Sequence, residues 1–126
     1  MQAADLDVLI VDDHEGMRVL LTRVLVRVGV QRVRQAANGA DALAALNARP
    51  ASLVLADRNM PGMNGLAFAA AVRADPVLAH ARIIMISGDV SADHREAALA
   101  AGVDTVLEKP VSPRDLLGAI EALFAV

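Results

Sequence analysis

Residues 6–13 read Leu-Asp-Val-Leu-Ile-Val-Asp-Asp, an almost continuous apolar run that ends on two aspartates. Such runs are typical of strands that are buried on both faces of a parallel sheet. Short runs rich in branched aliphatic residues recur along the chain, and those at 53–56 and 83–86 are equally apolar. The pattern therefore predicts five strands, at Leu6–Val11, Val33–Ala36, Leu53–Ala56, Ile83–Ile86 and Thr105–Leu107.

The segments between these runs carry apolar residues at the spacing of an amphipathic helix. The first expected helix runs from about Glu15 to Val28, and Gly29 follows where a left-handed cap would end it. The last begins with Ser112 as its cap and Pro113 in its first turn, which is a strong start signal. The other helices are expected over about 40–48, from 65 to just before 76, and from after 91 to 102. On the first helix the predicted core stripe is Met17, Leu20, Leu21, Val24, Leu25 and Val28.

This alternation of strands and helices predicts a three-layer α/β sandwich, (βα)5, in which a parallel sheet lies between helices on both sides. The 126 residues fit one domain of ordinary size. We therefore expect a single domain over residues 1–126, with no output domain after it.

The composition excludes several kinds of protein. The chain has no cysteine, which removes disulfide frameworks, thiolate metal sites and cysteine nucleophiles. Its net charge of −3 argues against a general nucleic-acid-binding protein. The longest unbroken apolar stretch, residues 65–72, is far shorter than the roughly 20 residues of a membrane span, and the first residues lack the pattern of a secretory signal. We expect a cytoplasmic protein with no membrane contact.

Polar residues follow four of the five predicted strands. The carboxyl ends of parallel strands share one edge of the sheet, and ligands bind there. Three carboxylates at that edge would repel one another, and Mg²⁺, which prefers oxygen ligands, would relieve the repulsion. A carboxylate such as Asp57 could then attack phosphorus, while an ammonium and a hydroxyl neutralise the phosphoryl oxygens. The residues at these strand ends are Asp12, Asp13, Asp57, Ser87, Glu108 and Lys109.

The same residues also allow a structural interpretation, in which Asp12 and Asp13 cap the first helix and Lys109 forms a surface ion pair. The chain carries 11 arginines and one lysine, so the position of that lysine at this edge is conspicuous. The three histidines, His14, His80 and His94, lack the spacing of metal ligands. We expect them at the surface, with His14 bordering the acidic pair.

The order and spacing of these residues closely resemble the receiver domain of two-component response regulators, of the single-domain type that serves chemotaxis. The most specific segment is residues 57–65, Asp-Arg-Asn-Met-Pro-Gly-Met-Asn-Gly, which is preceded by Asp12-Asp13 and followed by Ser87 and Lys109-Pro110. The resemblance covers essentially the whole chain. It implies a flavodoxin-like fold, with a five-stranded parallel sheet in the order 2-1-3-4-5.

The resemblance also implies how the acidic residues work. Asp57 would be the phosphoacceptor. Asp12, Asp13 and Asp57, together with the backbone carbonyl of Asn59, would hold Mg²⁺.

For the switch, the resemblance implies that Ser87 is the hydroxyl and Lys109 the ammonium that contact the phosphoryl group. The Lys109–Pro110 bond is expected to be cis, which X–Pro bonds permit at modest cost. Members of the family often carry an aromatic residue on the last strand that swings inward. The best match here is Val106, so the aromatic readout is not available to this chain.

The positions two after the acceptor and two after the hydroxyl, Asn59 and Asp89, would flank the path of a hydrolytic water and tune the lifetime of the phosphorylated state. Both are short and polar, so we expect a lifetime of seconds to minutes. Arg58, next to the acceptor, could lengthen it by folding over the pocket.

A basic segment on the first helix suggests a partner surface. Residues 18–34 contain five arginines and no acid. Val19 and Val26 lie opposite the predicted core stripe, beside Arg23 and Arg27, and an apolar strip with a basic rim suits docking onto a helical phosphodonor. The simpler interpretation is a solvated basic helix face. The candidate partner surface comprises Val19, Arg23, Val26, Arg27 and Val106.

Together these features predict a signalling module, not an enzyme with external substrates. It would take a phosphoryl group from a histidine kinase or histidine phosphotransfer protein and act on an output protein through its last two helices and last strand, as a monomer or weak homodimer. One alternative is a constitutive protein-interaction module with a vestigial acidic pocket. Another is an aspartate-dependent phosphohydrolase, but these enzymes usually carry Asp-x-Asp, whereas residues 57–59 read Asp-Arg-Asn. The chain has no nucleotide-binding Gly-x-x-x-x-Gly-Lys loop.

Overall fold

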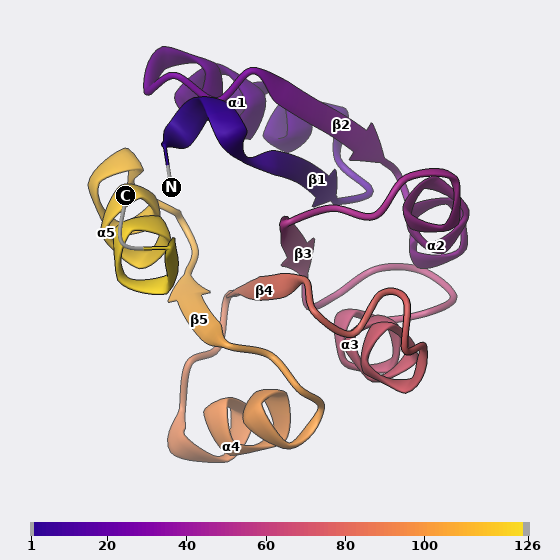
Figure 1. Ribbon diagram of the computed structural model, residues 1–126. Coiled ribbons are helices and arrows are strands. Elements are labelled where there is room, and N and C mark those ends of the chain that lie inside the picture. Colours follow the sequence, from indigo (N-terminus) through magenta and orange to yellow (C-terminus); the bar gives the residue numbers. More distant parts are fainter. Residues whose placement is uncertain (1, 125–126) are drawn as a thin grey trace.

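The structure is a computed structural model that describes residues 2–124, in which five strands alternate with five α-helices (Figure 1). Each strand boundary lies within one residue of its predicted position. None of the helices within residues 2–124 is both long and apolar enough to cross a membrane. After a 3₁₀ turn at Ala3–Asp5, the elements are β1 (Asp7–Val11), α1 (Glu15–Arg27), β2 (Arg32–Ala36), α2 (Gly39–Ala48), β3 (Leu53–Asp57), α3 (Gly65–Ala74), β4 (Arg82–Ser87), α4 (Ala92–Ala100), β5 (Thr105–Glu108) and α5 (Pro113–Phe124).

The strands of residues 2–124 form one parallel sheet in the order β2-β1-β3-β4-β5. The predicted flavodoxin-like order is therefore confirmed. Figure 1 shows α1 and α5 on one side of the sheet and α2, α3 and α4 on the other. The winding direction reverses between β1 and β3, so the ligand crevice of such a sheet lies at the carboxyl ends of these two strands.

Two separate apolar clusters cover the two faces of the sheet, because successive strand residues point to opposite faces. Leu9 and Val54 belong to the cluster beneath α2 and α3. Val8 and Leu53 belong to the cluster beneath α1 and α5. Both β1 and β3 are buried along their whole length, as their apolar runs predicted. Their carboxyl ends are consequently fixed at the centre of the sheet edge.

Helix α1 differs from its predicted core stripe at one position. Leu21 and Leu25 are buried against the sheet, but the side chain of Leu20 is 51% exposed. An α-helix turns about 100° per residue, so Leu20 falls on the outer border of a stripe that is centred on Leu21 and Leu25. The prediction that Leu20 belongs to the core is therefore wrong, and this residue adds an apolar side chain to the outer face. Gly29 follows α1 with a positive φ of 103°, as the cap prediction required.

Arginines hold the edge of the sheet at the amino ends of the strands. Arg73 of α3 donates to the carboxylate of Asp104 at 2.9 Å and to backbone carbonyls in the loops before β4 and β5. Asp7, at the start of β1, is paired with Arg34 and Arg49. Asp7 and Asp104 thus each have two arginine partners at this edge.

Candidate functional site

Asp57, the last residue of β3, is 2% exposed and lies at the carboxyl edge of the sheet. The following residue is tied to β4, since the backbone N–H of Arg58 donates to the carbonyl of Ile86 at 3.0 Å. Gly65 begins α3 directly behind this turn. A Cβ at Gly65 would lie 2.5 Å from the carbonyl oxygen of Asp57, so the close approach of α3 to the end of β3 requires glycine.

The two carboxylate oxygens of Asp57 have different surroundings. Oδ1 accepts a hydrogen bond from Lys109 Nζ at 2.8 Å and one from the backbone N–H of Asn59 at 3.2 Å. Oδ2 is buried and has no hydrogen-bond partner among residues 2–124. Lys109 reaches Asp57 from the loop after β5, where its backbone N–H donates to the carbonyl of Ser87 and its bond to Pro110 is cis, as expected.

Asp12 and Asp13 follow β1 and bring two more carboxylates to the same place. Asp12 is 2% exposed, and its backbone N–H donates to the carbonyl of Ala36 in β2. Asp12 Oδ1 accepts from the backbone N–H of His14 at 2.8 Å. Arg18 donates to the backbone carbonyl of Asp12 at 2.7 Å, which anchors the turn to α1.

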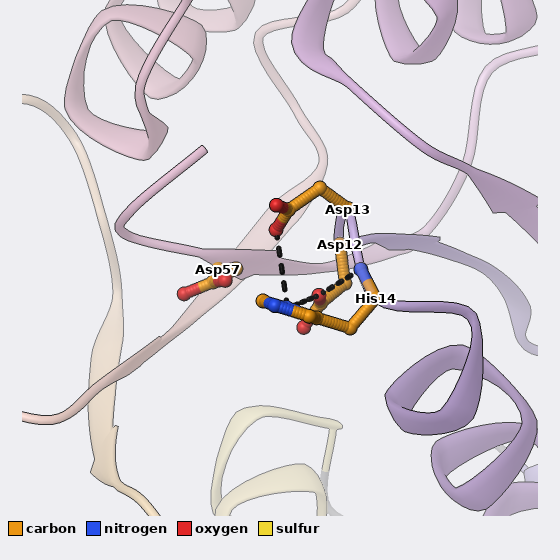
Figure 2. A group of neighbouring side chains, drawn as sticks. All are labelled: Asp12, Asp13, His14 and Asp57. Carbon is orange, nitrogen blue, oxygen red and sulfur yellow. Dashed lines mark hydrogen bonds and ion pairs between the residues drawn. The ribbon is translucent and has the colours of Figure 1, made fainter. Parts of the chain in front are cut away.

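One carboxylate oxygen from each of Asp12, Asp13 and Asp57 and one ring nitrogen of His14 lie within 4.8 Å of one another. Figure 2 shows the His14 ring beside the carboxylates of Asp12 and Asp13, with Asp57 close by. Asp13 Oδ1, like Asp57 Oδ2, is buried without a hydrogen-bond partner among the described residues. Unpartnered buried oxygens of this kind fit a hard divalent cation, which takes carboxylate and carbonyl ligands. The predicted acidic cluster is therefore formed, and it could hold a metal ion.

Ser87, the last residue of β4, is 1% exposed. Its hydroxyl donates to the backbone carbonyl of Asp89 at 2.8 Å and accepts from the backbone N–H of Asp89 at 3.1 Å. In this conformation the Ser87 hydroxyl is bound to its own turn.

Arg58 does not fold over the acidic pocket. Its guanidinium donates to the backbone carbonyl of His94 in α4 at 3.0 Å. The possibility that Arg58 shields Asp57 is therefore not realised in this conformation. A contact over 36 positions of sequence carries no sequence signal, and this link was not predicted, whereas the position of His14 beside the acidic pair is as expected.

Asp89, which precedes α4, is an exposed carboxylate with a network of its own. Hydrogen bonds from the backbone N–H and then the side chain of Ser91 lower the pKa of Asp89 below its usual value, and the charges of His94 and Arg58 lower it further. Asn59 is exposed as well, so the two residues expected to flank the pocket are both accessible to water.

The candidate partner surface is only partly contiguous. Val19 and Val26 on α1 are 37% and 58% exposed, and Arg23 and Arg27 are exposed beside them. Val106, by contrast, is 8% exposed and belongs to the apolar cluster on the opposite face of the sheet. Strand alternation directs it away from α1. Including Val106 in this surface was therefore wrong, whereas Leu20 extends it.

Comparison with known proteins places this geometry among described relatives. The family model for the response regulator receiver domain matches residues 8–121. The chain is 36% identical over 124 residues to a probable chemotaxis protein CheY of Rhizobium etli, covering 97% of this chain and 95% of that protein. It is 34% identical to the chemotaxis protein CheY of Pseudomonas aeruginosa, covering 93% and 94%. The solved structure of chemotaxis protein CheY4 of Vibrio cholerae is similar with a TM-score of 0.89 and 30% identity, covering 94% and 98% of the two chains.

The crowding of carboxylates generates a prediction about stability. Replacing Asp13 by Asn removes one negative charge from the cluster, so we expect the free energy of unfolding without divalent cations to rise by about 1 kcal/mol. The chain has no tryptophan or tyrosine, so urea unfolding in EDTA should be followed by far-ultraviolet circular dichroism. Asp93→Asn, an exposed change in the first turn of α4, is the matched control and should be neutral or slightly destabilising. A clear loss of stability in Asp13→Asn would contradict the repulsion.

Proposed function

Because the chain belongs to the family of response regulator receiver domains, we propose that it accepts a phosphoryl group on Asp57 from a phosphohistidine and passes the signal on through protein contacts. The donor would be a histidine kinase or a histidine phosphotransfer protein, in the cytoplasm. The observation that carries this proposal is the state of Asp57, a carboxylate that is 2% exposed with one oxygen bound by Lys109 and the other without a hydrogen-bond partner among residues 2–124.

Asp57 Oδ2 is the proposed nucleophile because Oδ1 is engaged by Lys109 and by the backbone of Asn59. As Oδ2 forms its bond to phosphorus, the bond from phosphorus to the donor imidazole breaks and its electron pair stays on that nitrogen. The donor leaves as neutral imidazole, since its other nitrogen carries a proton. The product is an acyl phosphate on Asp57.

Asp12, Asp13 and Asp57, together with the backbone carbonyl of Asn59, would hold Mg²⁺ during this reaction. The buried Asp13 Oδ1, which has no hydrogen-bond partner among residues 2–124, supports this assignment. When bound, the ion neutralises charge on the phosphoryl oxygens and helps to align them. Lys109 Nζ, already 2.8 Å from Asp57, is the second cation available to the transferred group.

Conversion of Asp57 to an acyl phosphate would redistribute the contacts of Lys109 and Ser87. Charge moves from the carboxylate to the phosphoryl oxygens, so the ammonium of Lys109 follows it. The Ser87 hydroxyl can exchange the Asp89 carbonyl for a phosphoryl oxygen, because charge-assisted hydrogen bonds are stronger than neutral ones. Ser87 ends β4 and adjoins the β4–α4 turn, and Lys109 directly follows β5. The proposed output is therefore a change around α4, β5 and α5, without an aromatic residue at Val106.

The proposed donor surface is the outer face of α1. Val19, Leu20 and Val26 are exposed apolar side chains on this helix, and Arg23 and Arg27 lie among them. This helix starts immediately after Asp13 and His14, so a helical donor lying on it has its reactive histidine near the carboxyl edge. The basic rim favours a donor with acidic residues around its phosphohistidine.

Asp57→Asn should keep the fold and lose phosphorylation by a small donor such as phosphoramidate, because an amide is a poor nucleophile for phosphorus. Intact-protein mass spectrometry measures the adduct. Asp89→Asn is the matched control and should still be modified. Full phosphorylation of Asp57→Asn would refute the acceptor assignment.

If wild type is phosphorylated yet shows no change in the nuclear magnetic resonance shifts of α4 and α5, the chain is instead a constitutive interaction module.

The α1 surface can be tested by comparing two donors. Val26→Asp should lower the rate of transfer from a phosphorylated histidine phosphotransfer protein by about tenfold or more, the usual effect of losing a central apolar contact. Its reaction with phosphoramidate should be unchanged, because that donor needs no docking. Leu99→Asp, a similarly exposed apolar position on α4, is the control. Equal effects of the two variants on transfer would exclude α1 as the donor surface.

The lifetime of the acyl phosphate depends on water reaching phosphorus in line with the bond to Asp57. That attack forms a new bond from phosphorus to oxygen, returns the electron pair to the Asp57 carboxylate and releases inorganic phosphate. Asn59 and Asp89 are short, polar and exposed, so we expect a wild-type lifetime of seconds to minutes. Asn59→Met and Asp89→Leu should each lengthen it severalfold, measured by phosphate release. Asp93→Leu should not, and a wild-type lifetime of hours that neither change affects would disprove this role.

A further inference from the structure

His14 brings a nitrogen atom into the acidic cluster. Its side chain is 70% exposed, yet its ring Nδ1 lies 3.2 Å from Asp12 Oδ1 and 3.3 Å from Asp13 Oδ1. The residue is held in place by its backbone, since its N–H donates to Asp12 Oδ1 and its carbonyl accepts from Arg18 at the start of α1. Figure 2 shows the ring reaching back from this position toward the carboxylates.

These spacings match those of neighbouring ligands around one octahedral ion. Ligand atoms at about 2.1 Å from a metal are separated by about 3.0 Å when adjacent and about 4.2 Å when opposite. The two distances from Nδ1 are close to the adjacent value, and the whole set of four ligand atoms lies within 4.8 Å. Asp57, one of these four residues, also has a buried oxygen, Oδ2, without a hydrogen-bond partner among residues 2–124. The atoms therefore need only small movements to surround a single cation.

We propose that His14 Nδ1 is a direct ligand in this site and gives it a preference for a divalent first-row transition ion over Mg²⁺. The proposal rests on the proposed function, because it concerns the same cation site. Mg²⁺ favours oxygen ligands and binds imidazole poorly, whereas Mn²⁺, Co²⁺ and Ni²⁺ bind imidazole nitrogen with an affinity that rises in that order, and Zn²⁺ also accepts it. A site of three carboxylates and one imidazole thus differs in metal preference from one of oxygen atoms alone.

The competing explanation is that His14 only supplies positive charge to Asp12 and Asp13. The two explanations predict effects of opposite sign. Removing a metal ligand weakens binding of the ions that use nitrogen and leaves Mg²⁺ nearly unaffected. Removing a neighbouring positive charge strengthens the binding of every divalent cation by a similar factor.

The test is His14→Ala, titrated with Co²⁺ and with Mg²⁺ by isothermal titration calorimetry in a non-coordinating buffer. We expect the Kd for Co²⁺ to rise by about tenfold or more, the scale of losing a contact that supports a metal, and the Kd for Mg²⁺ to change by less than about threefold. In the Co²⁺ form of the wild type, one set of histidine ring protons should be shifted by the paramagnetic ion. This signal should vanish in His14→Ala and persist in His80→Ala, since His80 lies in the loop before β4 at the amino edge.

Equal fold-changes for Co²⁺ and Mg²⁺ in His14→Ala, or no shifted histidine signal in wild type, would overturn the proposal and leave the phosphoacceptor role of Asp57 standing. Failure of the wild type to bind either ion would overturn both the ligand role of His14 and the cation site of the proposed function.

Discussion

Mutual repulsion among Asp12, Asp13 and Asp57 is the constraint to which the rest of the site responds. The parallel sheet forces these carboxylates together, because β1 and β3 are neighbours and end at the same edge. Two of the three residues are 2% exposed, so water cannot screen them as it does at a surface. The ammonium of Lys109 accordingly lies 2.8 Å from the carboxylate of Asp57. The cluster favours any ligand that adds positive charge, and a phosphoryl group can be accommodated only together with such charge.

Lys109 is the counter-charge that the fold itself supplies. Its side chain extends from the loop after β5 to Asp57 at the end of β3. Its backbone N–H donates to the carbonyl of Ser87 at the end of β4. Lys109 therefore links the ends of three strands, because its ammonium binds Asp57 of β3, its backbone N–H binds Ser87 of β4 and it directly follows β5. A change in the charge of Asp57 acts on β4 and β5 through this contact, which explains how a local covalent event could reach surfaces remote from it.

The helices on the two sides of the sheet are connected to the acidic cluster in different ways. Helix α1 begins at the cluster and presents exposed valines and arginines, whereas α4 is linked to the cluster through Arg58 and the turn that contains Asp89. Approach of a donor and transmission of the signal can thus use separate faces. Val106 is buried in the core and has no aromatic ring that could move. The hydrogen bond from Arg58 to His94 therefore connects the residue after Asp57 directly to α4.

The sequence by itself determined the alternation of strands and helices, the three-layer sandwich and the gathering of Asp12, Asp13, Asp57, Ser87 and Lys109 at one edge. Apolar runs and strand ends are local features, and a parallel sheet has only one edge for its carboxyl ends. Tertiary structure alone decided the rest: Leu20 turns outward, Val106 turns inward and Arg58 reaches α4. The direction of a long or borderline side chain depends on the elements that pack beside it. Those elements lie far away in the chain, as the 36 positions between Arg58 and His94 illustrate.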